Sequence, residues 1–125
     1  SAGLATAEGE YRAALGLAAL NPYYHNNLGR ILEVKALQEP ADLAKAEAFY
    51  RRSAELAPHV AFFQANLALF LESHDRSSEA DSRFLRALEL SPRLGHDAVQ
   101  RALVLAHERG DAPRVEALNQ ILAEE

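Results

Sequence analysis

The five histidines have the widest choice of chemistry in this sequence, because an imidazole can transfer protons or bind a metal ion. They are spread along the chain as His25, His59, His74, His96 and His107. His96 and His107 share a predicted helix but are 11 residues apart, about 16 Å along its axis and too far for one metal ion. No HExxH, glycine-rich phosphate loop, GxSxG or paired-carboxylate motif is present. The sequence predicts neither an enzyme nor a metal or cofactor site.

Composition and charge exclude further classes. The chain has 125 residues, 49% hydrophobic and 25% charged, which suits one compact domain or a short repeat array. A formal charge of −5 argues against nucleic acid as a partner, since phosphate binding needs a concentrated basic surface. The absence of cysteine excludes disulfides and leaves the cellular compartment undetermined. The most apolar segment, 60–71, is too short to span a bilayer, so we expect no membrane insertion of this segment.

Apolar residues recur at intervals of three and four, the period of an α-helix, and no segment alternates as a strand does. Proline, glycine and polar residues interrupt this pattern at six places. The interruptions predict an all-α chain of seven helices over residues 4–20, 23–37, 41–56, 60–74, 78–90, 95–109 and 113–124. Because the connections are short, neighbouring helices should form antiparallel hairpins.

Two long stretches share one order of residue types: a large residue, Leu followed by Gly or Ala, Ala-x3-aromatic, and Pro. In the first stretch these fall on His25, Leu28-Gly29, Leu32, Ala46-x3-Tyr50 and Pro58. In the second they fall on Gln64, Leu67-Ala68, Leu71, Ala80-x3-Phe84 and Pro92. Pro58 and Pro92 are 34 residues apart, the period of the tetratricopeptide repeat (TPR). The sequence therefore resembles a TPR array.

This resemblance implies a single superhelical domain over residues 1–125 rather than an ordinary closed bundle. It would contain a half repeat at 4–20 and repeats at about 23–57, 60–91 and 95–124. Small residues should permit close helix crossing at Gly29, Ala68 and Ala102. Aromatic residues should pack between hairpins at Tyr11, Tyr50 and Phe84. The late position of Pro22 suggests a first helix longer by about a turn, and extra residues after Gly29 should lengthen a helix or enlarge the turn at 38–42.

The resemblance also implies that the first helix of each pair lines a concave groove. Asn27, Asn66 and Gln100 would point into it, and an amide can bind any peptide backbone because it both donates and accepts hydrogen bonds. The other residues expected there are Tyr23, Arg30, Glu33, Phe62, Leu69, Glu72, Val99, Leu103 and His107. Alternatively, Asn27 and Asn66 cap or bridge neighbouring helices. The set lacks the Lys, Arg and Asn clamp with which chaperone-binding TPR domains hold a C-terminal carboxylate.

These expectations favour a protein- or peptide-binding scaffold. A second interpretation keeps the fold: "NPYYHNNLGR" and "EPADLAKAE" look similar to soluble tails of bacterial membrane glycan polymerases and ligases. The segment would then be an extracytoplasmic accessory part, whereas a cytoplasmic module is the default.

The two ends of the chain are expected to differ. Polar residues of the last helix could cover that end of the array: Arg114, Glu116, Asn119, Gln120, Glu124 and Glu125. The first helix carries Leu4, Leu15, Leu17 and Leu20 with no partner helix preceding it in this sequence. We expect either that more repeats precede Ser1 in the full protein or that this edge associates with another copy of the chain.

Overall fold

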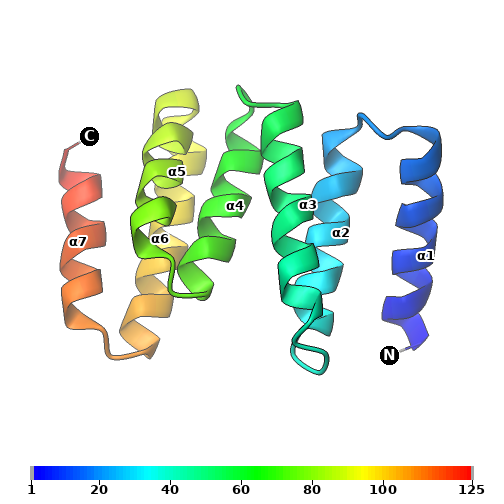
Figure 1. The fold of residues 1–125 in the computed structure, drawn as a ribbon. Coiled ribbons are helices and arrows are strands. Elements are labelled where there is room, and N and C mark those ends of the chain that lie inside the picture. The colour runs from blue at the N-terminus through cyan, green and yellow to red at the C-terminus, as the bar shows by residue number, and fades with distance from the viewer. Residues whose placement is uncertain (1, 125) are drawn as a thin grey trace. The chain divides into compact units, whose positions relative to one another are not determined.

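The computed structural model describes residues 2–124, and within them it contains seven α-helices and no strand (Figure 1). The helices are α1 (Ala2–Leu17), α2 (Pro22–Lys35), α3 (Asp42–Leu56), α4 (Ala61–Ser73), α5 (Ser77–Leu90), α6 (Pro92–Glu108) and α7 (Ala112–Ala123). The predicted all-α class is confirmed, and every helix was located correctly. The largest boundary differences are at the end of α1 and the start of α6, where Pro92 occupies the first helical turn.

The chain divides into two compact units, Ser1–Pro58 with α1 to α3 and His59–Glu125 with α4 to α7. In the first unit α2 packs against both α1 and α3. In the second unit α5 packs against α4 and α6, α4 also contacts α6, and α7 packs against α6. The pairs α2/α3 and α4/α5 are antiparallel hairpins (Figure 1). Within the second unit, the first helices of two successive hairpins therefore contact each other.

Gly29 is the point of closest approach within the α2/α3 hairpin. A Cβ atom at Gly29 would lie 3.1 Å from the ring of Tyr50 and 3.3 Å from the carbonyl oxygen of Ala46. Tyr50 and Ala46 are both buried, as the signature predicted. The small residue lets the aromatic ring lie flat against the backbone of α2, which is the physical reason for this pair of residue types.

The second unit has an equivalent apolar core. Phe84, Ala68, Ala80 and Ala102 are completely buried. A close contact that was not predicted lies at Gly95, near the start of α6. A Cβ atom there would lie 2.6 Å from both the backbone nitrogen and the Cα of Leu88, so α5 and α6 meet backbone to backbone.

Side-chain caps fix three helix starts. Asn21 accepts a hydrogen bond from the Tyr23 amide at 2.9 Å, and Asp111 accepts one from the Arg114 amide at 3.1 Å. Ser91 accepts one from the Leu94 amide at 3.3 Å. At α2 the asparagine that caps is Asn21, whereas Asn26 is buried one turn into the helix.

Two irregular spacings in the sequence are explained by connections, not by longer helices. α1 ends at Leu17, so the prediction of a first helix longer by a turn is wrong, and the extra residues lie in the connection at 18–21. Leu17 and Leu20 are exposed there. The insertion after Gly29 lies in the turn at 36–41, while α2 itself ends at Lys35.

Candidate binding site

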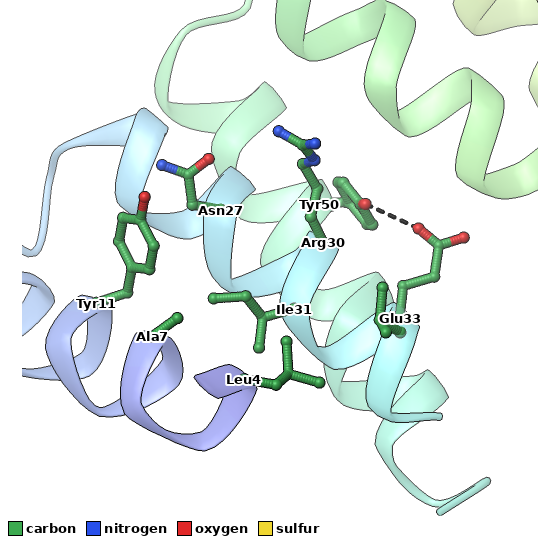
Figure 2. Close-up of a pocket in the computed structure, with 9 residues that line it drawn as sticks. Leu4, Ala7, Tyr11, Asn27, Arg30, Ile31, Glu33 and Tyr50 are labelled. Carbon is green, nitrogen blue, oxygen red and sulfur yellow. Dashed lines mark hydrogen bonds between the residues drawn. The ribbon is translucent and has the colours of Figure 1, made fainter. Parts of the chain in front are cut away.

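An open pocket of about 370 Å³ lies in the first unit, between α1, α2 and α3 (Figure 2). Its lining residues come from all three helices: Leu4, Ala7, Tyr11, Asn27, Arg30, Ile31, Glu33, Val34 and Tyr50. Figure 2 shows Leu4, Ala7 and Ile31 together on one side of the pocket. The side chains of Tyr11, Asn27 and Arg30 carry polar groups along another side. The pocket thus combines an apolar wall with hydrogen-bond donors, the guanidinium of Arg30 and the carboxylate of Glu33.

The periodicity of α2 explains why these residues share one surface. Asn27, Arg30 and Val34 are spaced by three and four residues, so they lie on the same side of the helix. Ile31 lies next to them and is buried against the neighbouring helices, while Arg30 and Val34 are exposed. The helix therefore presents a stripe that is apolar at its base and charged at its edge.

Tyr50 and Glu33 form a fixed hydrogen bond at one side of the pocket. The Tyr50 hydroxyl donates to Oε1 of Glu33 at 2.8 Å (Figure 2). Burial, and after it the neighbouring Glu33 carboxylate, raises the pKa of Tyr50. The phenol therefore stays protonated and keeps donating, and part of the acceptor capacity of Glu33 is used within the protein.

Arg30 supplies the positive charge of the pocket. In the part of the chain that the structure describes, no ion pair joins the Arg30 guanidinium to a carboxylate. Glu33, one turn further along α2, is hydrogen-bonded to Tyr50. The Arg30 side chain lies near Asn27 at the pocket rim (Figure 2). Its planar array of donors is thus available for an acceptor supplied from outside.

The α1 wall of the pocket is held by polar and aromatic contacts. Glu8 accepts hydrogen bonds from Lys35 at 2.8 Å and from Arg12 at 2.9 Å. The hydrogen bond from Lys35, followed by the one from Arg12, lowers the pKa of Glu8. Arg12 also lies over the ring of Phe49, at 5.6 Å from its centre. These contacts connect α1 to both α2 and α3.

A second hollow, of about 450 Å³, continues from the first along α2. The two hollows share Leu4 and Val34. The second is otherwise lined by Ala5, Lys35, Leu37, Gln38 and Glu39. Leu37 is 85% exposed and Val34 54% exposed, so two large aliphatic side chains of the same hollow lie open to water. We call the two hollows together the α1/α2 furrow.

The predicted groove residues fall into separate groups. Asn27 and Arg30 line the α1/α2 furrow, and Glu33 does so as well. Tyr23 is exposed on α2 but is not among the furrow residues. In the second unit Phe62, Asn66 and Leu69 share one face of α4 at helical spacing and are partly or fully exposed, and Gln100 and His107 are exposed on α6.

Glu72 is a correction, because its side chain is completely buried and cannot line an open groove. Its carboxylate accepts hydrogen bonds from Arg114 on α7 and from Arg109 at the end of α6. A carboxylate placed among apolar helices needs such partners to remain charged. Arg114 is correspondingly buried, so the prediction that it covers the end of the array as a surface residue is wrong.

Val99 and Leu103, two further expected groove residues, are also buried. They are part of the apolar side of α6, together with Ala98, Ala102 and Ala106. The other predicted covering residues of α7 that the structure describes are exposed: Glu116, Asn119, Gln120 and Glu124. Glu125 lies outside the described residues.

No local pattern in the sequence pointed to the furrow itself. Its walls need Leu4 and Tyr11 from α1 opposite Asn27 and Arg30 from α2, and the repeat signature does not specify how deeply α1 packs. Val34 and Leu37 could have been a clue, since both are large aliphatic residues outside the signature positions near the end of the helix predicted at 23–37.

Across residues 2–124, no group of three or more histidine, aspartate or glutamate side chains is arranged to hold a metal ion. None of the helices in that range is both long enough and apolar enough to cross a membrane. The sequence matches no protein-family model and no curated protein. The function of the chain must therefore be inferred from its helical hairpins and from the α1/α2 furrow.

Proposed function

We propose that this chain is a TPR-like interaction module that binds an extended peptide along the exposed face of α2, in the α1/α2 furrow. The observation that carries the proposal is the α1/α2 furrow. It is open, it has an apolar base, and it brings an amide, a guanidinium and a phenol to one rim. Such a surface suits a chain that offers backbone amides and alternating side chains rather than a small molecule enclosed on all sides.

Two features of the helices support a repeat architecture for this proposal. The close contact of Gly29 on α2 with Tyr50 and Ala46 on α3 supports the role that the TPR signature gives to Gly29, a small residue where the two helices of a hairpin cross. In the second unit, α6 packs against both α4 and α5, as expected when one hairpin stacks on the next. Asn27 on α2 and Asn66 on α4 occupy the same signature position, directly before a Leu-Gly or Leu-Ala pair, and both are partly exposed.

The test is selection from a random library of displayed dodecapeptides on the immobilised chain. Enriched peptides are then titrated into ¹⁵N-labelled protein. We expect amide shifts that concentrate on α1 and α2. Replacing Asn27 by alanine should weaken binding about two- to twelvefold, from one lost hydrogen bond of about 0.5–1.5 kcal/mol.

Asn119→Ala is the matched control, because Asn119 is exposed on α7 and the proposal gives it no contact with peptide. Circular dichroism must show that each variant retains its helical content. Failure to enrich any peptide above a blank surface contradicts the proposal. Full binding by the folded Asn27→Ala variant contradicts the role of that amide.

A further inference from the structure

We infer that the α1/α2 furrow recognises an extended segment in which an acidic side chain and an apolar side chain are two positions apart. This inference rests on the proposed function and specifies its ligand class. The acidic side chain would meet Arg30 at the Asn27 end, and the apolar side chain would enter the furrow beside Leu4 and Val34. The occupant is an internal stretch of a partner protein, because the furrow is open along its course.

Charge complementarity selects the acidic side chain. Arg30 is exposed at the rim, and among the described residues it has no carboxylate partner. Asn27 lies on the same side of α2, with its amide oxygen toward Arg30 (Figure 2), and rotation of its carboxamide would turn the NH2 group toward the same anion. A carboxylate can accept two parallel hydrogen bonds from one guanidinium, which a neutral amide side chain cannot reproduce.

The other cation near the furrow does not compete for this role. Lys35 donates to Glu8 at 2.8 Å and lies 3.9 Å from the carboxylate of Asp42. Its charge is therefore balanced within the protein. Glu39 lines the same end of the furrow and adds negative charge there. Glu33 places a carboxylate at the Arg30 end as well, held by the Tyr50 hydroxyl, so an acidic segment is selected there by direct contact with the Arg30 guanidinium and not by the net charge of the furrow. That contact fixes where its carboxylate lies.

Helix geometry gives the spacing between the acidic and the apolar side chain of the bound segment. From Arg30 to Val34 is four residues, a rise of about 6 Å along α2. An extended peptide advances about 3.3 Å per residue, and side chains two positions apart point to the same side. An acidic residue at Arg30 therefore places the residue two positions away next to Val34. This spacing is the same for either direction of the peptide along the helix.

Apolar surface supplies the second contact. Val34 and Leu37 are exposed next to Leu4, and they would lose contact with water under an aliphatic side chain of the ligand. Arg30 and Val34 are both exposed, so replacing either should leave the helical packing intact. The inference can therefore be tested without unfolding the protein.

The experiment uses octapeptides that are acetylated and amidated, so that they carry no terminal charge. One contains aspartate-threonine-leucine at its centre, a second has asparagine in place of aspartate, and a third has serine in place of leucine. Dissociation constants are measured by fluorescence anisotropy in 50 mM and 300 mM NaCl. We expect the change from aspartate to asparagine to weaken binding by roughly twofold to fivefold, and added salt to reduce this difference.

A double-mutant cycle identifies the partner residue. With Arg30→Gln, the aspartate and asparagine peptides should bind equally, and with Val34→Ser the leucine and serine peptides should become more alike. Arg101→Gln, which changes an exposed arginine on α6, is the matched control and should leave both differences unchanged.

The outcomes separate this inference from the proposed function. An aspartate preference that persists in Arg30→Gln overturns the inference. So does a chain that binds library-selected peptides but none of the acidic octapeptides, although peptide binding itself would then stand. If no peptide of either origin binds, both the proposed function and the inference are wrong.

Discussion

Arg114 on α7 and Glu72 on α4 form a buried ion pair across 42 positions of sequence. Nε of Arg114 donates to both carboxylate oxygens of Glu72, at 3.0 and 3.1 Å. Glu72 is 0% exposed and Arg114 7% exposed. Asp81 on α5 accepts a second hydrogen bond from Arg114 at 2.7 Å, and Arg109 donates to Glu72 at 3.0 Å. Since α7 packs mainly against α6, this cluster connects it to two further helices.

The cluster keeps its charges. Burial alone would lower the pKa of Arg114, but the hydrogen bonds to Glu72 and Asp81 outweigh it and raise that pKa above its ordinary value. Glu72→Gln leaves the buried guanidinium without its main counter-charge. We expect it to lower the free energy of unfolding by about 3–5 kcal/mol, measured by urea denaturation.

Two comparisons test that explanation. Asp81→Asn should cost clearly less, because Asp81 is 36% exposed and water can replace its contact. Replacing Glu72 and Arg114 together by leucine should restore much of the loss, since no buried charge then remains unpaired. A double variant as unstable as Glu72→Gln would contradict the electrostatic explanation.

Gly95→Ala should destabilise the second unit. The added methyl group would lie 2.6 Å from backbone atoms of Leu88, so α5 and α6 must separate. We expect a net loss of about 1–3 kcal/mol by urea denaturation, despite the better helix propensity of alanine. Gly9→Ala in α1 is the control, because a methyl group added there would meet no packing neighbour within 4 Å. It should stabilise its helix by about 0.5–1 kcal/mol, and equal effects at the two sites would refute the contact argument.

The attachment of α1 should depend on pH through Glu8 and Lys35. The pKa of Glu8 is lowered, so its contribution to stability is present above the ordinary glutamate pKa of about 4.3 and is lost as the pH falls through the lowered value. The pKa of Lys35 is raised by the hydrogen bond to Glu8, so its contribution is lost only as the pH rises through that raised value.

Thermal unfolding followed by circular dichroism should therefore separate wild type from Glu8→Gln at neutral pH. The difference in Tm should disappear in acid, where the protonated Glu8 of wild type is uncharged, as the glutamine of the variant is at every pH. Glu10→Gln, an exposed position on the same helix, should show no comparable difference. A difference between wild type and Glu8→Gln that is constant from neutral to acidic pH would rule out the ion pair as its cause.

Phe84→Ala should cost about 3–5 kcal/mol of unfolding free energy, because the ring is completely buried and its removal leaves a cavity. The neighbouring Leu85 is 42% exposed, so Leu85→Ala is a suitable comparison and should change stability much less. Both values come from urea denaturation. Similar losses at the two positions would mean that Phe84 is not a central packing residue.

The sequence by itself determined the local structure. The three-and-four periodicity and its interruptions by proline, glycine and polar residues located seven helices. The signature residues Gly29, Tyr50 and Phe84 were correctly assigned to close packing. These features could be predicted because helix periodicity and the size of a residue at a crossing are properties of short stretches of chain.

Only the tertiary structure decided which polar residues are buried and which apolar residues are exposed. Glu72 and Val34 occupy ordinary helical positions, yet Glu72 lies inside a cluster with Arg114 and Val34 lies open to water beside Leu4. Periodicity tells on which side of a helix a residue lies, but its surroundings depend on distant helices. The contact between Glu72 and Arg114 and the furrow between α1 and α2 each need segments that no local pattern connects.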